Sequence, residues 1–428
     1  MTKTLSSALV ALGFAGCIAA PPKSDAESPG GTSAGQPASS HASANVPPPS
    51  GSRRIVGYFP NWTQNREGCK YGVSDINPSL LTHINVAFAK VDPGPDRNKP
   101  KFKLMSYDEK ADLGPNGQYA QIAALKAKHT HLKTLISVGG WTFNDPAAKP
   151  NTEWVFSALA ETAATRAEFI DSAIRFAREH KFDGVDIDWE YPAEPTRGGR
   201  PQDTKNFTLL LKEFRAAIEA EAQKTGNAPL LLTIAAPAGA YYFRWLEIAE
   251  IHKPLDWINL MTYDYAGPWD GHTGFNAPSP ELGMGIPGSV SVYLNFGVPA
   301  DKIVLGLATY GRSYAGVEDP KPLSPSKGSG PKGRCTGALG MLAYFEVEEL
   351  IKSGKYKYNW DEASFTPYAY DSTAKVWVTY DDAKSYEKKL DFLQQKGLGG
   401  AMIWSLDTDD YKNGYPLVST IAKRLRGN

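Results

Sequence analysis

Three carboxylates occupy alternate positions, Asp186, Asp188 and Glu190, within the segment 182–192, which reads FDGVDIDWEYP. Successive side chains of an extended strand point to opposite faces, so the three acids share one face and the apolar residues between them share the other. Like charges this close raise one another's pKa, so the three carboxyls cannot all be ionised at neutral pH. The pattern predicts a row of acids for proton transfer. The alternatives are a solvated edge strand and a calcium site, although the Asn and Gly residues of a calcium loop are missing here.

The spacing Asp-x-x-Asp-x-Asp-x-Glu, at positions 183, 186, 188 and 190, resembles the signature of family 18 glycoside hydrolases, the chitinases. Four further segments agree with that family in order and spacing: YFPNW at 58–62, SVGGW at 137–141, MTYD at 261–264 and AMIW at 401–404. The resemblance covers about residues 53–425. It implies that this part of the chain is a catalytic barrel that hydrolyses β-1,4-linked N-acetylglucosamine polymers, with chitin or chito-oligosaccharides as its partner.

The resemblance also implies a mechanism. Glycosidases generally place two carboxyls across the sugar from each other, whereas here the acids lie on one strand, which suits a substrate whose own 2-acetamido group is the nucleophile. Glu190 is then the general acid and later the base. Asp188 orients the acetamido N–H, and Asp186 shares a proton with Asp188. Tyr263 donates a hydrogen bond to the acetamido oxygen. Asp183 has the opposite parity and is expected to be structural.

Substrate contacts follow from the same resemblance. Trp404 is expected to form a hydrophobic floor under the distorted sugar, and Gly139 and Gly140 permit close approach of the backbone. The remaining expected contacts are the stacking platforms Trp62, Trp141 and Trp269 and the pocket residues Tyr58, Phe88, Met261, Asp264 and Arg312. The alternative for each aromatic residue is a place in the core, since the chain has 10 Trp and 21 Tyr.

Short β-branched runs alternate with helical patterns from residue 53 onward, which predicts the α/β class and a (β/α)₈ TIM barrel. The eight expected strands are 55–59, 83–88, 133–138, 184–190, 230–235, 257–263, 303–308 and 400–404. Between the seventh strand and a helix expected after Asp381, its predicted N-cap, lies a connection far longer than the usual 2–6 residues. It resembles the small α+β insertion of one chitinase branch, at 313–378, and is expected to form one wall of a cleft at the carboxyl ends of the strands.

The first 52 residues predict export. Residues 1–17 combine Lys3 with an apolar run at 8–15, as a signal peptide does, and the run is too short to span a bilayer. The run ends in FAGC, which resembles a lipoprotein box with Cys17 as the lipidation candidate; the alternative is ordinary cleavage near Ala20. Residues 18–52 are rich in Ser, Pro, Gly and Ala and are predicted to be a disordered linker. The expected location is therefore secreted or attached to the cell envelope, with a lipid on Cys17 as the membrane anchor.

Composition argues against several other classes of protein. The 46 basic and 46 acidic residues balance, whereas a nucleic-acid or anionic-membrane partner favours a basic excess. The seven His show no His-Glu-x-x-His pattern, so neither a metal nor a cofactor is expected. The chain is expected to be a monomer. In an oxidising compartment Cys69 and Cys335 can form a disulfide, but their positions in the sequence do not decide it.

Two other functions remain open at this point. One is a chitin-binding lectin on the same barrel, although such relatives typically lack the acid that Glu190 supplies. The other is an endo-β-N-acetylglucosaminidase that acts on glycans, whose cleft is usually open, whereas the insertion implies a groove for a linear chain.

Overall fold

The computed structural model describes residues 53–95, 97–149, 151–280 and 283–426. The predicted export signal, the lipidation candidate Cys17 and the predicted linker all lie outside these ranges. Within them, no helix combines the length and the apolar character that crossing a bilayer requires.

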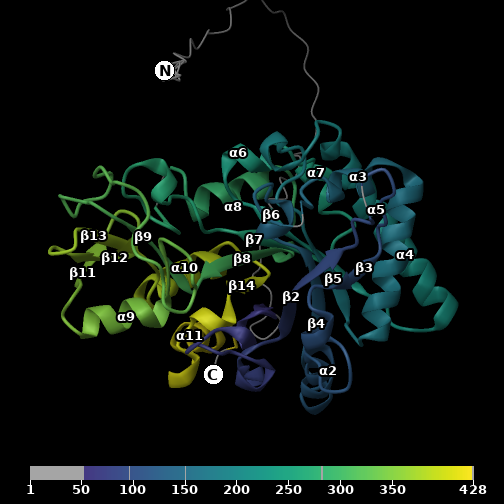
Figure 1. Ribbon diagram of the computed structural model, residues 1–428, viewed down its shortest axis with the longest axis horizontal. Coiled ribbons are helices and arrows are strands. Elements are labelled where there is room, and N and C mark those ends of the chain that lie inside the picture. The colour runs from purple at the N-terminus through teal and green to yellow at the C-terminus, as the bar shows by residue number, and fades with distance from the viewer. Residues whose placement is uncertain (1–52, 96, 150, 281–282, 427–428) are drawn as a thin grey trace, which may run out of the picture. The chain divides into compact units, whose positions relative to one another are not determined.

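Eight parallel strands form a closed barrel at the centre of the molecule (Figure 1). Their order is β1-β14-β8-β7-β6-β5-β4-β2, and β1 also pairs with β2, which closes the ring. This confirms the predicted (β/α)₈ barrel, with a strand at each of the eight predicted places. The strands are β1 (Arg54–Pro60), β2 (His83–Val91), β4 (Lys133–Gly139), β5 (Gly184–Asp188), β6 (Leu231–Pro237), β7 (Trp257–Met261), β8 (Ile303–Ala308) and β14 (Gly400–Trp404).

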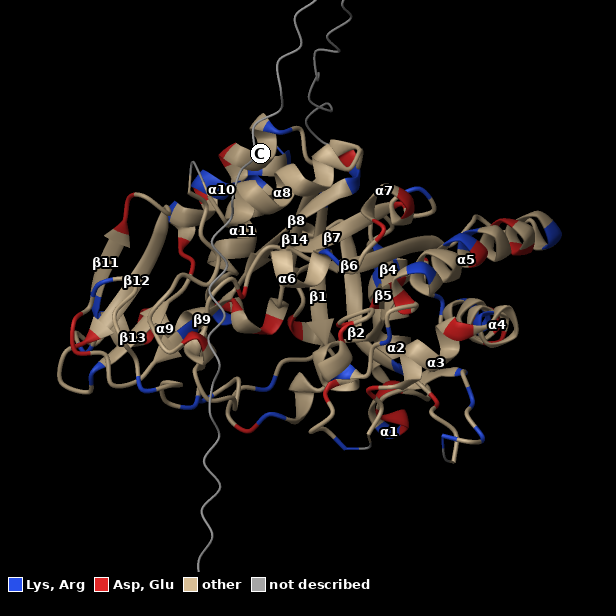
Figure 2. Cartoon of the chain, turned by 90° about the horizontal axis from the view of Figure 1, so that it is seen from above, with Lys and Arg blue, Asp and Glu red and all other residues tan. Residues whose placement is uncertain are grey.

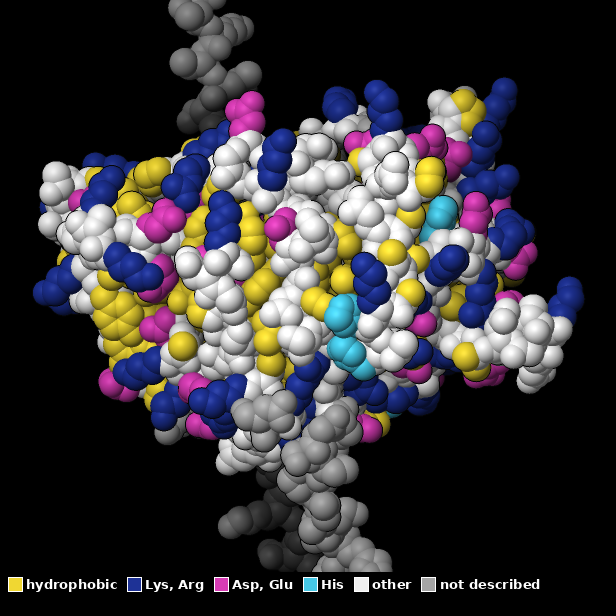
Figure 3. Space-filling view, turned by 90° about the horizontal axis from the view of Figure 1, so that it is seen from below, with side chains coloured by type: hydrophobic (Ala, Val, Ile, Leu, Met, Phe, Trp, Pro, Cys, Tyr) yellow, Lys and Arg dark blue, Asp and Glu magenta, His cyan; other side chains and the backbone are white. Residues whose placement is uncertain are grey.

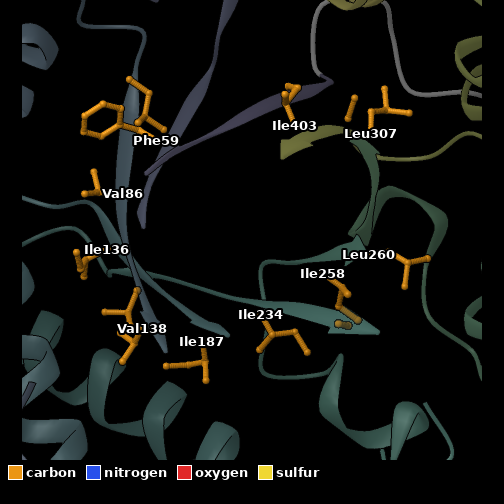
Figure 4. Close-up of a cluster of buried hydrophobic side chains, with 14 of the residues drawn as sticks. Phe59, Val86, Ile136, Val138, Ile187, Ile234, Ile258, Leu260, Leu307 and Ile403 are labelled. Carbon is orange, nitrogen blue, oxygen red and sulfur yellow. The ribbon is translucent and has the colours of Figure 1, made fainter. Parts of the chain in front are cut away.

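The barrel strands are buried on both faces, because alternate side chains fill two different clusters. Ile187 of β5 and Ile234 of β6 belong to the large cluster between the barrel and its helices, where Figure 4 shows apolar side chains pointing away from the ring of strands. Leu135 of β4 and Val304 of β8 belong to a smaller cluster inside the barrel. Near-continuous apolar strands are what a parallel sheet covered on its outer face requires.

Helices cover the outside of the barrel and carry many of the charged residues, whereas the barrel strands are mostly uncharged (Figure 2). Lysine, arginine and acidic side chains are interspersed on the face shown in Figure 3. The longer helices are α2 (Gln118–Lys128), α3 (Val155–Glu161), α4 (Ala163–Glu179), α5 (Asp203–Thr225), α8 (Ile286–Asn295), α10 (Ala383–Gln395) and α11 (Pro416–Arg426). The four-residue helices are α1 (Glu109–Asp112), α6 (Ala240–Phe243) and α7 (Ile248–Ile251).

Two details differ from the sequence-based expectation. The connection from β1 to β2 contains short 3₁₀ turns in place of an α-helix, because Gly68, Gly72 and Pro78 interrupt every run long enough for one. The N-cap of α10 is Asp382, whose side chain accepts from the Ser385 N–H. Asp381, the predicted cap, instead forms a buried ion pair with the Lys389 ammonium.

The long connection after β8 folds as the predicted α+β insertion. It contains a five-stranded antiparallel sheet in the order β10-β9-β13-β12-β11, with α9 (Tyr344–Lys352) beside it. Its strands are β9 (Tyr310–Tyr314), β10 (Met341–Ala343), β11 (Lys357–Asp361), β12 (Thr366–Asp371) and β13 (Val376–Thr379), so the sheet extends slightly beyond 313–378 at both ends. A further short strand, β3 (Leu104–Ser106), pairs antiparallel with β2.

A disulfide joins the loop after β1 to the insertion. Cys69 and Cys335 are 266 positions apart in the sequence, yet their Cα atoms lie 5.4 Å apart. Both residues are buried. The disulfide that the sequence left undecided is therefore present in this structure.

Candidate active site

Strand β5 places the row of acids inside the barrel, as the alternation of side chains predicts. Val185 and Ile187 pack outward in the large apolar cluster. Asp186 and Asp188 take the opposite parity, and Glu190 follows two residues beyond the end of the strand. The exposed fractions of the three acids rise along the row, 0% for Asp186, 4% for Asp188 and 8% for Glu190. The row therefore runs from the closed interior toward the carboxyl ends of the strands.

Asp186 is held by donors from four other strands. One oxygen accepts from the Tyr58 and Ser137 hydroxyls, each at 2.7 Å, and the other from the Thr233 hydroxyl at 2.5 Å and the Asn259 amide at 3.1 Å. Burial raises the pKa of Asp186, and the four hydrogen bonds oppose that rise by stabilising its charged form. Asp186 is thus fully buried, and four donors stabilise its charge in place of water.

Asp188 has a different environment. Its Oδ1 atom is buried and has no hydrogen-bond partner among the described residues. Burial raises the pKa of Asp188 well above its ordinary value, the charges of Glu190 and Asp186 raise it further, and Arg197 opposes them. All four side-chain hydrogen bonds to Asp186 come from other strands. The predicted sharing of a proton between Asp186 and Asp188 therefore has no matching hydrogen bond among the described residues. Asp188 therefore offers a buried acceptor to whatever enters the site.

Glu190 is fixed through its backbone, while its carboxyl stays at the mouth of the barrel. Its N–H donates to the Asn144 side-chain oxygen at 3.3 Å, and its carbonyl accepts from Arg197 Nε at 2.6 Å. Burial raises the pKa of Glu190 to about 7, against the opposing effects of Arg197 and of a hydrogen bond with Tyr191. A carboxyl that titrates near neutral pH is suited to both giving and taking a proton.

Aromatic side chains line the interior beside these acids. The Trp404 ring, at the end of β14, meets the Tyr58 ring edge-on at 5.4 Å and stacks on Phe88 at 5.7 Å. Met261 packs against the same interior cluster. The Tyr263 hydroxyl contacts Met402 Sδ at 3.8 Å, and a thioether is only a weak acceptor. The Tyr263 hydroxyl is consequently available for a better acceptor.

The three predicted stacking platforms are exposed. Trp62, Trp141 and Trp269 have exposed fractions of 43%, 50% and 61%. They follow β1, β4 and β7, and the carboxyl ends of parallel strands in a barrel meet at one rim. Trp62 stacks on Phe88 with the ring centres 6.1 Å apart. Large aromatic side chains left exposed together on one rim indicate a binding surface.

Arg312 connects the insertion to this rim. It lies on β9 of the insertion sheet. Its Nε atom donates to Asp264 Oδ1 at 2.7 Å, and its guanidinium lies 5.3 Å from the centre of the Trp269 ring. The predicted substrate contacts Asp264, Trp269 and Arg312 are therefore brought together, with one side of the group supplied by the insertion.

Gly139 and Gly140 let the end of β4 pass close to the acids. Their φ angles are 108° and 84°, a region that favours glycine. A Cβ on Gly139 would lie 2.3 Å from the Asp188 carbonyl oxygen, and one on Gly140 would lie 2.5 Å from the Phe88 ring. The Gly140 N–H also donates to the Asp188 carbonyl at 2.9 Å.

Asp183 lies at the other end of β5, away from the acids of the row. Its Oδ2 atom accepts from the Thr134 N–H and from the Lys126 ammonium, both at 2.8 Å. These contacts tie the start of β5 to its neighbours, and the structural role of Asp183 stays a prediction. Within the described ranges, no three or more His, Cys, Asp or Glu side chains are grouped so as to hold a metal ion.

Sequence reasoning missed several residues of the site. Ser137, Thr233 and Asn259 surround Asp186, and each is a polar residue with inward parity on an otherwise apolar strand. That combination is a signal that could have found them. Tyr242 stacks on Tyr191, with ring centres 4.1 Å apart, but it belongs to the four-residue helix α6, which has no periodic pattern. Arg197 contacts the Glu190 backbone, and no pattern in the sequence pointed to it either.

Comparison with known proteins agrees with this geometry. The family model described as glycosyl hydrolases family 18 matches residues 54–409. A probable endochitinase of Caenorhabditis elegans is 37% identical over 396 residues, which are 86% of this chain and 60% of that protein. The chain thus spans less than two thirds of the length of that relative.

Two solved structures are also similar. Catalytic domain 2 of the Group II chitinase of Ostrinia furnacalis superposes with a TM-score of 0.78 at 31% identity, covering 88% of this chain and 97% of that domain. Human YKL-39, described as a pseudo-chitinase with retained chitooligosaccharide binding, superposes with a TM-score of 0.76 at 32% identity, covering 88% of this chain and all of that one. With the family model matching most of the chain and the barrel carrying its acids at the expected places, this protein belongs to glycosyl hydrolase family 18.

Proposed function

We propose that the protein is a chitinase that hydrolyses β-1,4-linked N-acetylglucosamine polymers with retention of configuration and with the substrate's acetamido group as nucleophile. The observation that carries this proposal is the buried Asp188 Oδ1, which has no donor among the described residues. An unpaired buried acceptor is unfavourable, so the site is complementary to a ligand that brings an N–H to that point. The acetamido group of the substrate has such an N–H.

In the first step the Glu190 carboxyl gives its proton to the glycosidic oxygen, and the bond from that oxygen to the anomeric carbon breaks. The acetamido carbonyl oxygen bonds to the anomeric carbon and forms a cyclic oxazolinium ion. Asp188 accepts the acetamido N–H and offsets the positive charge of the ring, while Tyr263 donates to the acetamido oxygen. The leaving chain departs as an alcohol.

In the second step the Glu190 carboxylate takes a proton from a water molecule, whose oxygen attacks the anomeric carbon. The bond to the acetamido oxygen breaks, and Glu190 is again protonated. Two displacements at one carbon leave the product as the β-anomer. The rise in the pKa of Glu190 to about 7 supports this double role, because both forms are then populated near neutral pH.

A chitin-binding lectin is the second candidate, and it is favoured by one observation, the similarity to the pseudo-chitinase YKL-39. The presence of Glu190 at the mouth of the barrel argues for catalysis. The two candidates differ in turnover and agree in binding, so one experiment separates them.

The experiment uses chitopentaose and proton NMR within the first minutes, before mutarotation. We expect the new reducing end to form as the β-anomer. Fully deacetylated chitosan should not be cut, since a free amine has no carbonyl oxygen to reach the anomeric carbon. An initial α-anomer would show a single displacement by water and overturn the mechanism. Binding of chitopentaose without any turnover would support the lectin.

A further inference from the structure

Arg197 lies between the acid and a stacking platform. Its Nε atom donates to the Glu190 carbonyl at 2.6 Å, and its Nη2 atom donates to the Trp141 carbonyl. Its guanidinium carbon lies 3.6 Å from the centre of the Trp141 ring. Arg197 is 6% exposed, whereas Trp141 is 50% exposed. One face of the indole is therefore covered by the arginine, and much of the rest of the side chain is open to solvent.

Arg197 is buried, and among the described residues no carboxylate lies within ion-pair distance of its guanidinium; the arginine of this loop that forms an ion pair is Arg200, with Glu161. A buried charge that is not neutralised locally acts strongly on nearby titratable groups, because little water screens it. The nearest acids of the row are Glu190 and Asp188, and the charge of Arg197 favours the ionised form of each.

We propose that Arg197 is a positioning residue with two separable effects: its flat guanidinium holds Trp141 as a platform for the sugar chain, and its positive charge acts on the acid at Glu190. The inference deepens the proposed function and rests on it. The geometry supports it because the same side chain bonds both backbones and stacks on the ring. Arginine and lysine differ at such a site, since only arginine has a planar fork that stacks on an aromatic face.

The sign of the effect on pH dependence follows from the charges that surround the acid. Glu190 donates its proton in the first step, so kcat/KM falls as the pH rises through its pKa of about 7. Arg197 lowers that pKa, so removal of the charge raises it and moves the basic limb of the profile to higher pH. The other titratable groups that act on Glu190 or Arg197 are Asp188, Tyr191, Tyr242, Tyr263 and Asp264.

The test compares two substitutions. Arg197→Met keeps an apolar stem against the ring and removes the charge, whereas Arg197→Lys keeps the charge and removes the planar group. We expect Arg197→Met to shift the basic limb upward by about 0.5–1 pH unit and Arg197→Lys to leave it in place. Both should raise KM for chitohexaose by about 3–10-fold, because the stacking on Trp141 is lost.

Arg200→Met is the matched control. Arg200 belongs to the same loop, but its side chain bonds the Ser157 hydroxyl and carbonyl, away from the acids. It should leave both the basic limb and the KM unchanged. A basic limb that does not move in Arg197→Met, or moves equally in Arg197→Lys, would overturn the effect of the charge. An unchanged KM in both would overturn the effect on the platform.

Calorimetry of chitohexaose binding separates this inference from the proposed function. If the wild-type protein binds the sugar and does not cut it, the proposed hydrolysis fails, and the platform is still tested by the Kd of both Arg197 variants. If both Arg197 variants then had the same Kd as the wild type, the inference would be overturned. Thermal unfolding of each variant identifies a simple loss of folding. Such a loss would lower Tm by similar amounts in Arg197→Met and Arg197→Lys.

Discussion

Three loops of the rim present an exposed tryptophan, and two of them, those of Trp62 and Trp141, are anchored in different ways. Trp62 follows β1 and stacks on another aromatic ring, Phe88. Trp141 follows β4 and packs against a cation, the Arg197 guanidinium. The two indoles have similar exposed fractions. They differ in the residue on which each one packs, and in the other contacts of that residue and of its loop.

The Trp62 loop is anchored to regions far from the acids. The disulfide from Cys69 ties it to the insertion, and the Arg66 guanidinium forms an ion pair with Asp407. The hydroxyls of Tyr71 and Tyr415 lie 2.5 Å apart. None of these anchors is among the groups that shift the pKa of Glu190. The anchors of this loop therefore do not act on the charge of Glu190, whereas Trp62 itself reaches the barrel interior through Phe88 and Trp404.

The Trp141 loop shares its supports with the acids. Arg197 bonds the carbonyls of both Trp141 and Glu190, and the Gly140 N–H bonds the Asp188 carbonyl. A displacement of this loop would therefore also move the backbone of Asp188 and Glu190. If both tryptophans bind the sugar chain as proposed, we expect only binding at Trp141 to be coupled to the acid.

The largest expected effect is a loss of turnover on substitution of Glu190, which leaves the Trp62 and Trp141 loops unchanged. Glu190→Gln keeps the shape of the side chain and removes its proton, so kcat on chitopentaose should fall by about 10²–10⁴-fold. Binding of chitohexaose, measured by calorimetry, should stay within about twofold of wild type, because neither loop changes. A variant that keeps a tenth of the wild-type rate would remove Glu190 from the role of acid.

The next effect concerns the anchoring of the Trp62 loop. Replacement of Cys69 and Cys335 by Ser should lower the free energy of unfolding by about 2–4 kcal/mol, because the disulfide limits the unfolded chain over a long loop. Chemical denaturation measures it, with mild reduction of the wild type as the control. The basic limb of the pH profile should not move. A shift of that limb would show that this loop is coupled to the acid and would break the comparison.

The smallest effect compares the two rings directly. Trp62→Ala and Trp141→Ala should each weaken chitohexaose binding by about 5–30-fold, the loss expected when about 1–2 kcal/mol of aromatic burial is removed. Only Trp141→Ala should also lower kcat, since Arg197 then loses its stacking partner and holds the Glu190 backbone less firmly. Steady-state kinetics with titration calorimetry measures both. Equal kcat in the two variants would contradict the coupling.

The sequence alone was sufficient for the features that depend on local periodicity. A strand alternates its side chains with period 2, so the placement of Asp186, Asp188 and Glu190 on one face followed from their spacing. The eight strands followed from the alternation of short β-branched runs with helical patterns. The exposed Trp62, Trp141 and Trp269 followed from the family resemblance, since composition alone would have left each in the core.

Only the tertiary structure decided the contacts between residues far apart in the chain. Tyr58 donates to Asp186 across 128 positions, and Cys69 meets Cys335 across 266. The closing of the barrel brings such groups together, and no local pattern records that event. Asp381 illustrates the same limit over a shorter range, because its pairing with the buried Lys389 left the cap of α10 to its neighbour. Arg197 is the clearest case: its role depends on two backbones and one ring that become neighbours only when the loops after β4 and β5 meet at the rim of the barrel.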